Sequence, residues 1–136
     1  ESVYDHPLLW GSNRIGPDLA RIGGKYPHLW HVRHMEDPRS TSPASIMPPY
    51  PWLLEKELDA AVMPVRLAAL RKLGVPYTET EVTSAESATL AQAKQIAEEI
   101  EAQGGPARLD RREITAMVAY LQRLGADLKK TPVSTP

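Results

Sequence analysis

A methionine on a proline-rich segment is the residue whose surroundings most favour chemistry in this sequence. Met47 precedes Pro48-Pro49-Tyr50-Pro51-Trp52. Methionine normally acts as a flexible filler of hydrophobic cores, but prolines fix the neighbouring backbone and can hold the thioether in place. A pre-positioned thioether suits a soft ligand of haem iron, which stabilises the reduced iron and raises its potential. Taken alone, the segment leaves ordinary packing of Met47 as the alternative.

Three histidines at every third position form a second candidate site. His28, His31 and His34 fall on a predicted helix, and imidazole is the commonest metal ligand in proteins. Their spacing brings them only partly onto one helix face, and no nearby set of carboxylates completes a tetrahedral site. A His-based metal-binding module is therefore kept as an alternative, beside histidines that serve packing or the surface.

Composition limits the classes of function that the chain can have. Its 136 residues suffice for one domain. The net charge of -1 gives no electrostatic bias toward nucleic acid, so no nucleic-acid partner is expected. No cysteine is present, which excludes disulfides, thiolate zinc sites and a CxxCH motif within these residues. GxSxG, HExxH and phosphate-loop motifs are also missing, so a hydrolase is not predicted.

Helical patterns without convincing strands predict an all-α fold. The first 25 residues are too rich in glycine and proline for a long helix, and the prolines of residues 40–51 favour extended backbone. Elsewhere, apolar spacing indicates helices. Four main helices are expected, at residues 27–36, 59–73, 84–103 and 111–124.

Local signals suggest where these helices begin and end. Thr83 with Glu86, and Asp110 with Glu113, have the spacing of capping boxes that would start the last two helices. Glycines are common just after a helix ends, because they adopt left-handed backbone without strain. Such glycines follow the last three helices, at Gly74, Gly104 and Gly125.

Two further motifs accompany Met47 in a recognisable order. Gly16-Pro17-Asp18-Leu19 resembles the GPxL loop of c-type cytochromes, and the helix that contains Ala119-Tyr120-Leu121 is similar to their C-terminal helix. With longer phrases such as Leu9-Trp10-Gly11-Ser12 and Leu73-Gly74-Val75-Pro76-Tyr77, nearly the whole chain resembles the mono-haem cytochrome c subunit of cbb-type haem-copper oxidases. The resemblance is weakest at about residues 80–111.

The resemblance implies a cytochrome c-like helical domain with long irregular loops rich in proline and glycine. Residues 1–130 would form this domain, with the haem-side loops in 1–58 and a helical part in 59–130. Residues 131–136 would form a flexible tail. The family's CxxCH motif, proximal histidine and membrane anchor are expected upstream of Glu1, so the domain is expected to lack its N-terminal haem-bearing helix.

The same resemblance implies a role in electron transfer. The parent protein would carry haem c and relay electrons from a di-haem subunit to the catalytic haem-copper subunit, on the periplasmic side of the bacterial inner membrane. Met47 would be the distal iron ligand, and the carbonyl of Pro17 would orient the proximal histidine. Leu19 and Trp52 would wall the haem, and Arg14 would meet a propionate. No residue is expected to act as an acid, base or nucleophile.

Two expectations concern the chain as given. Without cysteines, it is expected to be a water-soluble, haem-free and redox-inactive fragment. The face of the last helix that covers the haem-bearing helix in the family would then be bare, and exposed apolar patches favour association. Self-association through Ile114, Met117, Val118 and Leu121 is therefore expected. A helical assembly domain without any cofactor is the remaining alternative, although it does not explain the ordered cytochrome motifs.

Overall fold

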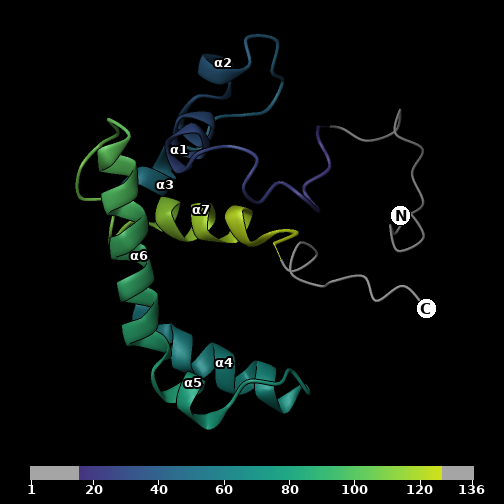
Figure 1. Cartoon of the computed structure of the whole chain (residues 1–136), viewed down its shortest axis with the longest axis vertical. Coiled ribbons are helices and arrows are strands. Elements are labelled where there is room, and N and C mark those ends of the chain that lie inside the picture. The colour runs from purple at the N-terminus through teal and green to yellow at the C-terminus, as the bar shows by residue number, and fades with distance from the viewer. Residues whose placement is uncertain (1–15, 127–136) are drawn as a thin grey trace, which may run out of the picture.

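The regular elements of the protein are helices joined by irregular loops (Figure 1). The computed structural model describes residues 16–126, and over this range it has no strand, only a bridge between Glu57 and Arg112. The expected all-α class is confirmed. Arg14, the motifs before residue 16 and the predicted tail at 131–136 lie outside the described residues. The helices are α1 (His28–Glu36), α2 (Pro38–Thr41), α3 (Trp52–Glu55), η3 (Ala60–Val62), α4 (Met63–Lys72), α5 (Glu79–Thr83), α6 (Ala85–Ala102) and α7 (Glu113–Arg123).

Helix α6 connects two groups of helices (Figure 1). At its C-terminal end it packs against α1 and α7, and α3 contacts both of these. Toward its N-terminal end it contacts η3, α4 and α5. Residues 63–83, which contain α4 and α5, are called the α4–α5 arm below. None of the helices within residues 16–126 is long and apolar enough to cross a membrane.

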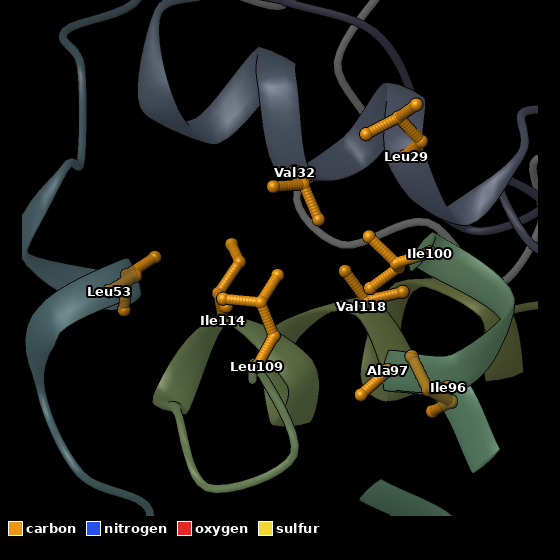
Figure 2. Packing of buried hydrophobic residues seen from close by; sticks show 9 residues of the cluster. All are labelled: Leu29, Val32, Leu53, Ile96, Ala97, Ile100, Leu109, Ile114 and Val118. Atoms are coloured by element: carbon orange, nitrogen blue, oxygen red, sulfur yellow. The ribbon is translucent and has the colours of Figure 1, made fainter. Parts of the chain in front are cut away.

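The hydrophobic core forms where α1, α6 and α7 meet (Figure 2). Val32, Ile100, Ile114 and Val118 are fully buried there. Burial of one such aliphatic side chain contributes about 1.5–3 kcal/mol, so this junction dominates the stability of the fold. The complete cluster comprises Leu29, Val32, Leu53, Ile96, Ala97, Ile100, Leu109, Ile114 and Val118.

The apolar face of α7 is covered, so the expectation of a bare patch is wrong. Ile114 and Val118 are fully buried, Leu121 is 5% exposed, and Met117 is partly buried. The cover comes from α1, α3 and α6, all of which pack against α7. Because helices of this chain already occupy the face, no such patch is left to drive the expected self-association.

The long helix α6 starts differently from the prediction because a short helix precedes it. The Glu81 N–H donates to Thr78 Oγ1 at 3.2 Å, and the Thr78 N–H donates to Glu81 Oε2 at 2.7 Å. This capping box starts α5 and lowers the pKa of Glu81, because its carboxylate accepts the Thr78 N–H and hydroxyl. Ser84 then forms the N-cap of α6 without a side-chain bond, so the predicted box of Thr83 with Glu86 is wrong.

The start of α7 also differs from the predicted capping box of Asp110 with Glu113. Arg112 is the N-cap and makes no side-chain cap bond. The Glu113 N–H instead donates to the Lys56 carbonyl at 3.0 Å, and Lys56 Nζ lies 2.8 Å from Glu113 Oε1. A backbone N–H at a helix start needs a partner from outside the helix, and here a distant segment supplies it.

Most of the other predicted boundaries are confirmed. Gly74, Gly104 and Gly125 have φ of 91°, 82° and 77° just after their helices, which is the left-handed backbone that glycine adopts at helix ends. Residues 42–51 contain turns and neither helix nor strand, as expected for a proline-rich loop, whereas residues 40–41 of the predicted extended segment belong to α2. The short helices α2 and α3, which flank this loop, are not among the predicted elements.

Candidate functional site

The loop that contains Pro17 and Leu19 is folded by local hydrogen bonds. The Ala20 N–H donates to Asp18 Oδ1 at 2.9 Å, and the Ile22 N–H donates to the Leu19 carbonyl at 3.1 Å. Ile22 is buried, whereas Pro17 and Leu19 remain exposed. Pro17 and Leu19 of the GPxL motif are therefore exposed on the surface, while Ile22, three residues after Leu19, fixes the loop in the interior.

The end of α7 anchors this loop. The Gly23 N–H donates to the Leu124 carbonyl at 2.9 Å, and the Gly24 N–H donates to Gln122 Oε1 at 2.7 Å. The Gln122 Nε2 group donates in turn to the Tyr26 carbonyl at 2.7 Å. A Cβ atom at Gly23 would lie 2.4 Å from the Gln122 carbonyl oxygen, so only glycine permits this close approach.

The loop that contains Met47 is fixed at two points. The Met47 N–H donates to Ser45 Oγ at 3.2 Å, and the Met47 side chain is partly buried. Three residues later, the Tyr50 N–H donates to the Met35 carbonyl in the last turn of α1 at 2.7 Å. Together with the prolines after Met47, these bonds restrict the positions that its thioether can occupy.

Trp52 begins α3 beside this loop and is 51% exposed. Its ring meets the Tyr50 ring edge-on, with centroids 5.1 Å apart. The next residue, Leu53, belongs to the core. Leu19 in the other loop is 46% exposed. Trp52 and Leu19 are thus two large apolar side chains that the described residues leave half uncovered.

Helix α1 is the element common to both loops. The first loop leads directly into it, and the Trp30 N–H donates to the Pro27 carbonyl at 3.1 Å in its first turn. The Met47 loop is tied to its last turn through Tyr50 and Met35. The structure therefore brings Met47 and Trp52 near the C-terminal end of α1, and it places Pro17 and Leu19 in the segment before its N-terminal end.

The three regularly spaced histidines have separate environments. His28 Nε2 lies 3.1 Å from Glu99 Oε2, and His34 Nδ1 lies 2.5 Å from Thr41 Oγ1. Among residues 16–126, no group of three or more His, Cys, Asp or Glu side chains could hold a metal ion. The described structure therefore gives the alternative of a His-based metal module no site.

His31 differs from its neighbours because it is buried without a hydrogen-bond partner at Nε2. The residue is 2% exposed, and Nε2 is a buried polar atom that has no partner. The Tyr26 and Trp30 rings meet it edge-on, with centroids 6.1 and 5.4 Å away. Burial lowers the pKa of His31, and the neighbouring His28 and His34 lower it further, so its neutral form is favoured.

Comparison with protein families places these loops in a known context. The family described as cytochrome c oxidase, mono-heme subunit/FixO, matches residues 1–128. This chain belongs to the FixO family. Its resemblance to the mono-haem oxidase subunit is thereby confirmed, and the family is the haem c-binding subunit of an oxidase complex in a membrane. Among curated proteins, none matches the chain.

The residues of this FixO chain can be tested for their fit to haem. Cysteine is not among the 136 residues, so the two thioether bonds of haem c are not made by them. Three observations nevertheless fit a haem group: the unpaired Nε2 of buried His31, the half-uncovered Leu19 and Trp52, and the anchored backbone of Met47. The sequence motifs predicted Leu19, Trp52 and Met47 as residues of the haem site. His31 was predicted only as a possible metal ligand, from the spacing of the histidines.

Proposed function

We propose that this chain is the haem-facing part of the periplasmic electron-transfer domain of a cbb-type cytochrome c oxidase. In this role the parent protein relays electrons from a di-haem subunit to the catalytic haem-copper subunit. Haem c would supply the one-electron iron couple when bound, and residues of the chain would ligate, cover and orient it. Membership of the FixO family supports this proposal, and the role needs no acid, base or nucleophile from the chain.

The anchored Met47 loop carries the proposal. A ligand whose backbone is already fixed loses little conformational freedom when it binds. Ser45 bonds the Met47 N–H, and the Tyr50 to Met35 bond ties the loop to α1. As the distal ligand, the Met47 thioether would stabilise reduced iron and raise its potential, which suits an electron carrier that delivers to an oxidase.

The other proposed site residues would cover and orient the haem. The side chains of Leu19 and Trp52 are 46% and 51% exposed. Removing this apolar surface from water would favour haem binding. The Pro17 carbonyl would accept a hydrogen bond from the proximal histidine and so fix the direction of that ring. Arg14 lies outside the described residues, and its contact with a propionate is proposed from the family resemblance alone.

The proposal is tested by replacing Met47 in the full-length subunit within the assembled oxidase. We expect Met47→Ala to abolish the low-spin spectrum of methionine-ligated haem, to lower the midpoint potential and to slow electron delivery. Met63→Ala is the matched control, because Met63 is also partly buried but begins α4. An unchanged spectrum and potential in Met47→Ala would show that Met47 is not the distal ligand.

A further inference from the structure

The buried Nε2 atom of His31 is a polar group whose partner is missing from the described residues. Buried polar groups almost always have a hydrogen-bond partner, and each exception needs an explanation. His34 on the same helix has such a partner in Thr41, and His28 has one in Glu99. His31 is more buried than either, yet its Nε2 has none.

An ordered water is a poor explanation for this atom. A buried water typically makes about three hydrogen bonds to polar groups. The aromatic rings that contact His31 are those of Tyr26 and Trp30, and neither side chain supplies a partner for Nε2. A neutral imidazole carries its proton on one of its two ring nitrogens. In the tautomer with the proton on Nε2, this atom needs an acceptor, and the described residues supply none.

The position of His31 limits where that acceptor lies. Side chains four residues apart lie on the same side of a helix, so His31 and Met35 share one side of α1. Met35 holds the Met47 loop through the Tyr50 N–H, and the His31 ring meets Tyr26 from the loop that follows Pro17 and Leu19. Both loops to which the haem is assigned are therefore attached to α1, one through the Met35 carbonyl in its last turn and the other through the contact of Tyr26 with the His31 ring.

We propose that His31 is a positioning residue whose Nε2–H donates a hydrogen bond to a propionate carboxylate of the haem. This inference rests on the proposed function, because it takes the haem to lie between the two loops. The propionates are the only strong acceptors on the rim of a haem, which is otherwise apolar, whereas a methionine thioether accepts only weakly. A charge-assisted bond to the carboxylate would satisfy the buried imidazole and fix the rotation of the haem in its site.

The proposal can be tested in the full-length subunit with its covalently attached haem, within the assembled oxidase. His31→Phe keeps a ring between Tyr26 and Trp30 but removes the donor, and His31→Gln restores an N–H at a similar reach. His34→Phe is the matched control, because His34 stacks on Trp30 with ring centroids 4.5 Å apart and has its own partner. The readouts are redox-difference infrared spectra with isotope-labelled propionates and the midpoint potential of the haem.

We expect His31→Phe to shift the propionate carboxylate bands and to lower the midpoint potential, because the carboxylate charge is less neutralised. His31→Gln should reverse part of both changes, and His34→Phe should cause neither. Carboxylate bands that match the parent in both His31 variants would overturn the proposal. A changed methionine-ligation spectrum without a change in these bands would also overturn it, since His31 would then act on Met47.

The two proposals fail separately in these experiments. The ligation spectrum of Met47→Ala decides the proposed function, whereas the carboxylate bands of the His31 variants decide the role of His31. Haem content and helical circular dichroism of each variant verify that it is folded, and His31→Gln provides a second route if the phenylalanine variant does not assemble.

Discussion

His31 links the packing of α1 to the pH dependence of the stability of this chain. Its pKa is lowered by burial from the ordinary value of 6.5. The unfolded chain therefore binds more protons than the folded chain between the two pKa values, and stability rises with pH in that window. The contribution of His31 to the free energy of unfolding should be complete above about pH 6.5. It should decrease as the pH is lowered below that value.

The prediction is that His31→Phe makes this pH dependence shallower. Urea denaturation at a series of values from about pH 5 to pH 8 gives the slope. The pKa of His34 is lowered as well, by desolvation, so a double variant with His34→Phe should be flatter still. If the parent and His31→Phe have equal slopes, proton uptake on unfolding takes place at other groups.

Single residues of the candidate site can be nominated from the sequence where a motif carries them, and their roles stay predictions. The flanking prolines marked Met47, and the GPxL pattern marked Pro17 and Leu19, because in both cases the chemistry is local in sequence. The missing partner of His31 was not predictable. It depends on which rings surround the imidazole in three dimensions, and the spacing of the histidines suggested metal binding instead.

Among the elements, α5 depends on its capping box more than on packing, since none of its residues is buried. Thr78→Ala removes the side chain that accepts the Glu81 N–H, which typically costs about 1 kcal/mol at an N-cap. The same change should raise the pKa of Glu81 toward its ordinary value, because the hydroxyl bond that lowers it is lost. NMR titration of Glu81, together with urea denaturation, measures both effects.

Thr83→Ala is the control for this prediction, because the sequence pattern had marked Thr83 as a cap. Its hydroxyl donates only to the Glu79 and Thr80 carbonyls within α5. We expect little change in stability and none in the Glu81 titration. Equal effects of the two variants would mean that the capping box adds nothing specific to the start of α5.

Helices were more predictable than their starting points. The apolar spacing of α6 and α7 and the glycines after the helices encode their faces and ends locally. The start of α7 is set instead by the Lys56 carbonyl, which is distant in sequence. The two capping boxes that the sequence predicted at the starts of α6 and α7 are not formed. The covered face of α7 could not be foreseen either, because it depends on how α1, α3 and α6 assemble around it.

On the scale of the whole molecule, burial is unevenly distributed along α6. The junction with α1 and α7 contains the fully buried side chains, whereas α4 has no buried residue. Val65 and Leu73 on the arm are 68% and 81% exposed. Regions with few buried apolar contacts open at lower free energy than the core, so the α4–α5 arm should behave as a separate unit of lower stability.

Native-state hydrogen exchange tests this division. Amides of residues 63–83 should exchange through openings of lower free energy than the amides of α7, whose Ile114 and Val118 are fully buried. Thr78→Ala should speed exchange in the arm alone. Ile114→Ala, which should cost about 2–5 kcal/mol, should instead lower the protection of amides at the junction of α1, α6 and α7, which exchange through the opening of the core. Equal protection in α4 and α7 would contradict the division and would mean that the arm unfolds together with the core.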